Sequence, residues 1–157
     1  MRFLLQAVLS GLMVTLAMSL ALVATAQAAD TIVDYLIVGD EIPKRLSAEP
    51  GNPGRGRETV RDMAQVTCLI CHAMPIPEEP DHGQICPSLI GIGSRLSEGQ
   101  IRLRLVDQKS MNSKSIMPAY YQTQNLTRVQ ELYKERTIYS PQQLEDVVAY
   151  LTSLKDR

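Results

Sequence analysis

The chain has 157 residues, of which 45% are hydrophobic and only 4% aromatic. Its 16 Lys and Arg residues nearly balance its 17 Asp and Glu residues, which gives a formal net charge of −1. This balance gives no support to binding of nucleic acids or of acidic membranes through a strongly basic surface. The length suffices for one domain of ordinary size and not for two, once the N-terminal segment is set aside.

Residues 1–28 have the pattern of a secretory signal peptide. Arg2 is the single charged residue before Asp30, residues 3–24 form an apolar stretch, and residues 26–28 read Ala-Gln-Ala, an A-x-A cleavage site. The alternative is an uncleaved membrane anchor, because the apolar stretch is nearly long enough to span a bilayer. The cleavage site favours removal, which predicts an exported, periplasmic protein with no stable membrane insertion.

Residues 29–53 are predicted to be an extended lead-in arm, and residues 54–157 the folded domain. The arm contains three prolines and shows no sustained hydrophobic period. A first helix is predicted to begin near Pro53 and to run through Val60, Met63 and Ala64 toward residue 68, since its apolar positions have helical spacing.

Residues 68–72 read Cys-Leu-Ile-Cys-His, the C-x-x-C-H signature of covalent c-type haem attachment. Two thiols three residues apart on a helical turn can form thioethers with the vinyl groups on one porphyrin edge. The imidazole that follows then becomes the proximal iron ligand. The sequence therefore predicts one haem c bound covalently by Cys68 and Cys71, with His72 as an iron ligand.

Two other interpretations of this motif fit the sequence less well. A zinc site needs a second pair of ligands, and only His82 and Cys86 remain to supply it. A thioredoxin-like dithiol needs no following histidine and lies in a βαβ pattern, which is absent here.

Two further helices are predicted from capping signals. Ser97 and Gln100 form a capping box, and the helix that follows has an apolar face and leaves Arg102 and Arg104 more exposed. This face comprises Ile101, Leu105 and Val106. Residues 108–136 have no clear period.

The last helix has the clearest pattern. Ser140 is its N-cap, Pro141 occupies N1 and Gln143 completes a second capping box. Its apolar positions are Leu144, Val147, Val148, Leu151 and Leu154. No strand pattern competes after the signal segment, so the predicted fold class is all-α with long loops.

Met117 is the predicted sixth ligand of the iron. It lies in Ser-Ile-Met-Pro-Ala-Tyr, where Pro118 fixes the adjoining backbone and prevents a helix. Met111 is the alternative in the same segment, and His82, in the loop on the proximal side, is a further candidate. Ligation by His and Met raises the reduction potential and closes the iron to exogenous ligands, which favours electron transfer.

The order of helix, C-x-x-C-H, proximal loop, middle helix, Met-Pro and C-terminal helix resembles a class I cytochrome c. Within that class the chain resembles the SoxX cytochromes, the small subunits of thiosulfate-oxidising SoxAX complexes. The resemblance covers residues 40–154. Its most specific parts are Met-Pro-Ile-Pro-Glu-Glu at residues 74–79 and the two tyrosines at residues 120–121. Other matching stretches are residues 42–43, 51–57, 87–93 and 145–151.

The resemblance implies a class I cytochrome c-like fold, with three or more helices and long loops around one covalent haem. It also implies roles for particular residues. Cys68 and Cys71 would hold the haem, and His72 and Met117 would be its axial ligands. The carbonyl oxygen of Pro87 would accept the Nδ1 proton of His72, which fixes the orientation of the ring.

The resemblance also implies a function. SoxAX joins thiosulfate oxidatively to a cysteine of the carrier protein SoxYZ, and the haem of SoxX accepts the released electrons. The chain would be a non-catalytic subunit of a heteromeric L-cysteine S-thiosulfotransferase. Its partners would be a SoxA-like cytochrome, a SoxYZ-like carrier and a downstream cytochrome acceptor. The alternative is a free-standing periplasmic electron shuttle, and a third possibility, a haem enzyme or gas sensor with an open sixth position, conflicts with Met117.

Cys86 departs from the pattern of these cytochromes, which usually have Gly before the proline of the proximal loop. One interpretation is a small residue packed beside the porphyrin, and the other is a free thiol available to a partner or to sulfur chemistry. If the backbone there had a positive φ, Cys86 would strain the loop and loosen the bond between Pro87 and His72.

Overall fold

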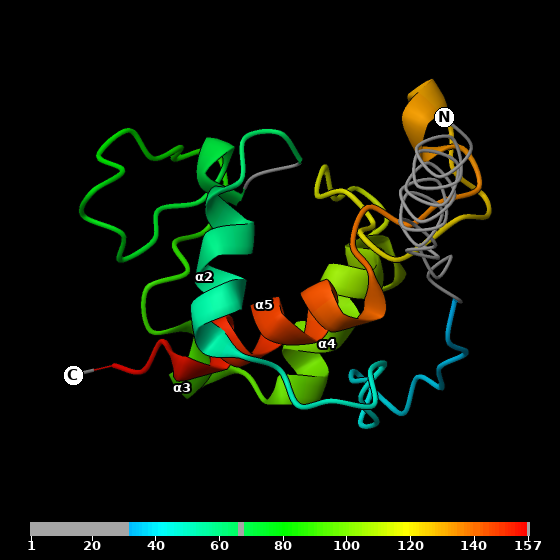
Figure 1. The fold of residues 1–157 in the computed structure, drawn as a ribbon, viewed down its shortest axis with the longest axis horizontal. Coiled ribbons are helices and arrows are strands. Elements are labelled where there is room, and N and C mark those ends of the chain that lie inside the picture. Colours follow the sequence, from blue (N-terminus) through cyan, green and yellow to red (C-terminus); the bar gives the residue numbers. More distant parts are fainter. Residues whose placement is uncertain (1–31, 66–67, 157) are drawn as a thin grey trace, which may run out of the picture.

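The structure is a computed structural model that describes residues 32–65 and 68–156 (Figure 1). The predicted signal peptide, residues 1–28, lies outside this range. The α-helices are α2 (Pro53–Arg61), α3 (Ile92–Arg95), α4 (Glu98–Asp107) and α5 (Pro141–Ser153). Three short 3₁₀ turns accompany them: η1 (Cys68–Ile70), η2 (Gln108–Ser110) and η3 (Glu131–Tyr133). The described residues form no strand, apart from one isolated bridge between Val38 and Glu41, so the all-α prediction is confirmed.

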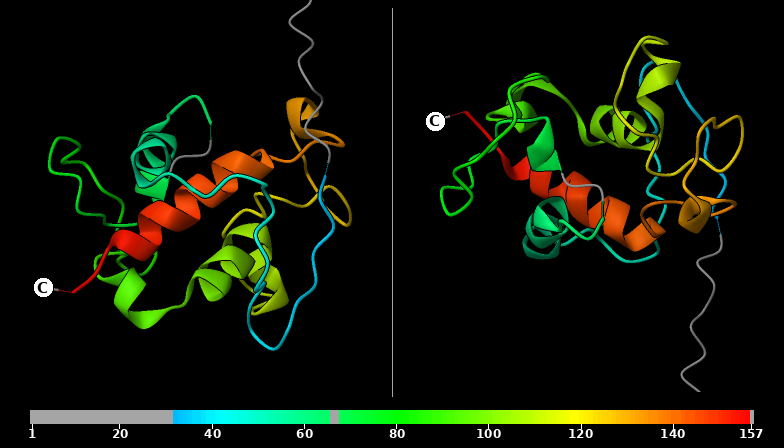
Figure 2. Two further views of the ribbon diagram at one scale, coloured as in Figure 1. Left: turned by 60° about the horizontal axis from the view of Figure 1, so that its bottom comes forward. Right: turned by 90° about the horizontal axis from the view of Figure 1, so that it is seen from above.

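The helix α5 is the centre of the fold. The helices α2 and α4 lie on different sides of it, and α3 packs near its C-terminal end (Figures 1 and 2). Both predicted capping boxes are present, at Ser97 with Gln100 and at Ser140 with Gln143. The predicted apolar faces form the core, which includes Ile101, Leu105, Val106, Leu144, Val147, Val148 and Leu151.

Gly56 explains how α2 and α5 come so close together. A Cβ atom at this position would collide with the backbone carbonyl of Asp146 and crowd Tyr150. Only glycine fits at this position, because the backbones of α2 and α5 are in direct contact here. Gly56 is buried in this contact.

The first helix is shorter than predicted. It ends at Arg61, so Met63 and Ala64 are not helical. Asp62 causes this end, since its backbone is extended and its side chain accepts hydrogen bonds from the Ala64 N–H at 2.9 Å and from Gln65 at 3.0 Å. Such local bonds from Asp compete with helix continuation.

The prediction that Arg102 is exposed is wrong. Its side chain is 1% exposed and forms a bidentate pair with Glu145 of α5, with distances of 2.7 and 2.8 Å. The guanidinium also donates to the Ile42 carbonyl at 2.7 Å, and Glu145 accepts the Leu46 N–H at 2.9 Å. This buried ion pair therefore fixes part of the lead-in arm, where Ile42 and Leu46 are buried in the common core.

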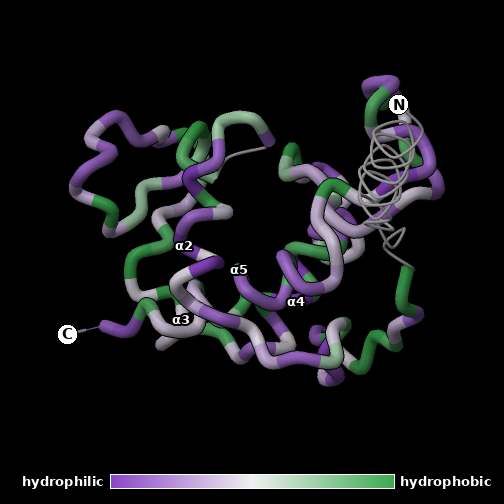
Figure 3. Tube along the Cα trace, in the orientation of Figure 1, coloured by the Kyte–Doolittle hydropathy of each residue, from purple (hydrophilic) through white to green (hydrophobic). Residues whose placement is uncertain are grey.

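Residues 32–38 of the arm are mostly apolar and, apart from the partly buried Tyr35, lie exposed at the surface (Figure 3). Leu36 is 74% exposed and Val38 52%. Among the described residues, no helix has the length and apolar character needed to cross a membrane.

Candidate haem-binding site

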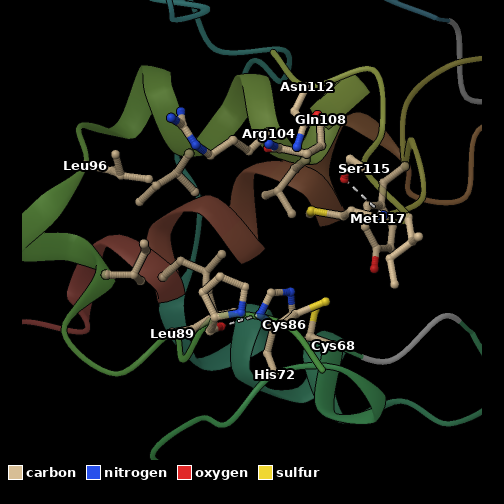
Figure 4. Close-up of a pocket in the computed structure, with 17 residues that line it drawn as sticks. Cys68, His72, Cys86, Leu89, Leu96, Arg104, Gln108, Asn112, Ser115 and Met117 are labelled. Carbon is tan, nitrogen blue, oxygen red and sulfur yellow. Dashed lines mark hydrogen bonds between the residues drawn. The ribbon is translucent and has the colours of Figure 1, made fainter. Parts of the chain in front are cut away.

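One cavity of about 340 Å³ brings together most of the predicted site residues (Figure 4). Cys68, His72, Pro87 and Met117 all line it, as do Cys86 and Tyr120, whereas Cys71 does not. The rest of the wall is mostly apolar, with contributions from Leu89, Ile92, Leu96, Ile101, Leu105, Ile116 and Leu151. Four polar side chains also line it: Arg104, Gln108, Asn112 and Ser115.

The C-x-x-C-H segment forms a tight turn that places Cys68 and His72 on the same wall. The carbonyl oxygen of Cys68 accepts the N–H of Cys71 at 3.1 Å and that of His72 at 2.9 Å. The Nδ1 atom of His72 lies 2.6 Å from the carbonyl oxygen of Pro87. If Nδ1 carries the proton and donates it to this oxygen, Nε2 is left unprotonated and able to bind a metal.

The loop that follows this turn and carries Pro87 is held to the turn by three backbone hydrogen bonds. The N–H groups of Gly83, Cys86 and Leu89 donate to the carbonyls of residues 69, 71 and 73 at 2.7, 3.0 and 2.9 Å. The loop therefore holds Pro87 in place without regular secondary structure.

Met117 lies on the wall opposite His72, and the two side chains face each other across the cavity (Figure 4). Ser115 Oγ accepts the Met117 N–H at 3.2 Å, and Pro118 follows directly. The alternative Met111 is 41% exposed and does not line the cavity. His82 accepts the Met74 N–H at 3.1 Å through Nδ1 and is also absent from the wall. The axial role of Met117 stays a prediction, with a geometry that suits it.

Burial raises the pKa of the Cys68 thiol to about 11, although hydrogen bonds with the hydroxyls of Tyr120 and Tyr139 act in the opposite direction. The two tyrosine rings are stacked, with centroids 4.6 Å apart. Burial also raises the pKa of both tyrosines. No local pattern connects Tyr139 with Cys68, because Tyr139 lies 71 positions further along the chain.

Cys86 lies next to Cys71. Their thiols are within hydrogen-bonding reach, and the backbone N–H of Cys86 donates to the carbonyl of Cys71. Burial, followed by the proximity of Cys86, raises the pKa of Cys71. The backbone of Cys86 is not left-handed, so the strain expected for a positive φ does not arise.

The donor set fits a c-type haem better than zinc. Within residues 32–65 and 68–156, no three His, Cys, Asp or Glu side chains are arranged to hold a metal ion. The cavity instead combines one imidazole, one thioether and the thiols of Cys68 and Cys86 with mostly apolar walls, a set that suits a porphyrin and its iron.

Comparisons with known proteins agree with this geometry. No protein-family model and no curated protein sequence matches the chain. Among solved structures, the crystal structure of SoxXA from P. pantotrophus contains a chain with 30% sequence identity and a TM-score of 0.68. The match covers 78% of this chain and 95% of that one. The predicted cytochrome c-like fold is thereby confirmed.

Proposed function

The chain belongs to the SoxXA-related cytochromes, and from this premise we propose that it is a SoxX-type electron-transfer subunit with one covalently bound haem c. The matched SoxXA chain is the shorter of the two, since the same alignment covers 95% of it and 78% of this chain. A short matched chain and a single C-x-x-C-H motif support the small, mono-haem subunit. The signal pattern of residues 1–28 supports a periplasmic location.

The observation that carries the proposal is the placement of His72 and Met117 on opposite walls of one apolar cavity, with Cys68 at its edge. When bound there, a haem supplies an iron that accepts and releases single electrons. Cys68 and Cys71 would hold it covalently, and Pro87 would orient the His72 ring. With Met117 opposite His72, no open coordination position would remain for oxygen or peroxide.

The partners follow from the family. We propose that a SoxA-like cytochrome supplies the reactive cysteine and that a SoxYZ-like carrier receives the thiosulfate sulfur. A downstream cytochrome would then take the electrons from this chain. In such a complex the chain accepts electrons and does not itself catalyse the transfer of sulfur, because its attachment cysteines are consumed by thioether formation.

The test is reduction by thiosulfate, followed in the haem absorbance of the purified, haem-loaded chain. We expect no useful rate with the chain alone, and rapid reduction once a SoxA-like cytochrome and a carrier with a free cysteine are both added. A carrier whose cysteine is replaced by Ser is the matched control and should restore no reduction. Rapid reduction without partners, or no response to the complete set, would contradict the proposal and leave the free-standing shuttle as the better explanation.

A further inference from the structure

Three polar side chains on the mostly apolar wall of the cavity, Arg104, Gln108 and Asn112, have no task in the function proposed above. They are four positions apart, so they lie on one face of the segment formed by α4 and η2. The N–H of Asn112 donates to the Gln108 carbonyl at 3.0 Å, which continues the helical turn beyond η2. Figure 4 shows the three residues together on the wall across the cavity from His72.

Arg104 differs from Arg102, two residues earlier in the same helix. Arg102 has its counter-charge in Glu145, whereas Arg104 forms no ion pair with any described residue. One of its terminal nitrogens, Nη1, donates to the Gln100 carbonyl at 2.8 Å, and the N–H groups of Nε and Nη2 remain available. A half-buried cation in a mostly apolar wall is unfavourable without a negative partner. The wall therefore calls for an anionic group on the ligand.

A haem has such groups, since its apolar ring carries propionate side chains that end in carboxylates. An arginine can bind a carboxylate through two parallel N–H···O bonds, and the amide groups of Gln and Asn can donate further bonds. The Oδ1 atom of Asn112 already accepts the Lys114 N–H at 3.1 Å, which leaves the amide nitrogen of Asn112 as its donor. The apolar part of the wall suits the ring, and this polar face suits its carboxylates.

We propose that Arg104 binds the propionate carboxylates of the haem, with Gln108 and Asn112 as additional donors. The contact fixes how the ring is turned within the cavity, which the attachment cysteines and the axial ligands determine only in part. It also compensates negative charge that would otherwise stabilise ferric iron, so Arg104 raises the reduction potential. This inference rests on the proposed haem site and adds residues outside the C-x-x-C-H and Met-Pro motifs.

The experiment measures the reduction potential of the haem-loaded full chain against pH, followed in the haem absorbance. Arg104→Gln should shift the redox equilibrium toward the oxidised form by about fivefold at neutral pH, because a carboxylate loses its counter-charge. Without Arg104 this carboxyl has a higher pKa and takes up a proton sooner as the pH falls. The potential of the variant should therefore rise toward the wild-type value in acid.

Two further variants separate this role from a structural one. Arg104→Lys keeps the charge and should stay close to the wild-type potential. Arg136→Gln removes the same charge from an exposed residue that does not line the cavity, and it should leave the potential and its pH profile unchanged. If Arg104→Gln had the profile of this control, the inference would be overturned.

Asn112→Asp covers the case in which Arg104→Gln holds too little haem to measure. It is isosteric, lies at an exposed position and adds a negative charge beside the carboxylates, so it should lower the potential. An unchanged potential would overturn the inference. The proposed function fails separately, because the wild type would then carry no covalent haem or lack the far-red sulfur-to-iron charge-transfer band before any substitution is made.

Discussion

The helical framework and the loops that carry the predicted haem ligands are held together in different ways. The framework of α2, α4 and α5 depends on close helix contacts and on buried charge, as at Gly56 and in the pair of Arg102 with Glu145. The cavity residues His72, Pro87 and Met117 lie in turns and loops that a few hydrogen bonds hold in place. We therefore expect substitutions in the framework to act mainly on stability, and substitutions in these loops to act mainly on the candidate haem site.

The largest expected effect on the framework comes from Glu145→Ala. It leaves the buried guanidinium of Arg102 without its counter-charge, and the Leu46 N–H without its acceptor. We expect the free energy of unfolding to fall by about 3–5 kcal/mol, measured by urea denaturation. Glu98→Ala is the control, because Glu98 lies 3.9 Å from the same Arg102 but is 62% exposed, and it should cost at most about 1 kcal/mol. Equal losses in the two variants would contradict the account.

Gly56→Ala should have the next largest effect. The added methyl group meets the backbone of Asp146, which cannot move aside as a side chain could, and we expect a loss of about 1–3 kcal/mol in unfolding free energy. The comparison is Gly54→Ala, two residues earlier in α2, where the nearest obstacle is the side chain of Asn52 at 3.1 Å. That variant should be neutral or slightly more stable, because Ala favours a helix over Gly. A similar loss at both glycines would show that the close helix contact is not the cause.

A smaller and pH-dependent effect is expected at Asp146, which joins α5 to the start of α2. Burial tends to raise the pKa of this carboxyl, but hydrogen bonds from Arg55, Asn52 and Gln142 outweigh it and lower the pKa from its usual 3.8. A carboxyl whose pKa is lower in the folded state stabilises the fold above the unfolded value and loses that contribution as the pH falls through the folded value. Asp146→Asn should therefore cost about 1–2 kcal/mol at neutral pH, and the difference from wild type should shrink below about pH 4. A difference that stays constant from pH 7 to pH 3 would exclude this explanation.

Local signals in the sequence predicted much of the framework. The capping boxes at Ser97 and Ser140 and the apolar period of the last helix depend only on neighbouring residues, and each is present in the structure. The early end of α2 could have been anticipated from Asp62, whose side chain bonds to the residues that follow it. The burial of Arg102 could not, because its partner Glu145 lies 43 residues further along the chain.

The residues of the candidate site were likewise predictable where a local motif marks them, and not where they depend on packing. The C-x-x-C-H motif and Met-Pro identify Cys68, His72 and Met117, and the structure places them around one cavity. The stacking of Tyr139 on Tyr120 depends on how the segment before α5 packs against the segment after Met117, which no local pattern encodes. Cys86 stood out in the sequence as a departure from the family. The structure adds that its thiol adjoins Cys71 and that its backbone is unstrained.

The proposed ligation of the iron by Met117 can be tested by the absorption spectrum of the oxidised protein before and after Met117→His. We expect the wild type to show the weak far-red charge-transfer band of a sulfur ligand. The variant should lose this band, keep its covalent haem and have a lower reduction potential, since imidazole stabilises ferric iron better than a thioether does. The helix content should be unchanged, because Met117 lies outside the framework. Survival of the band in the variant would show that another sulfur binds the iron and would contradict the site described above.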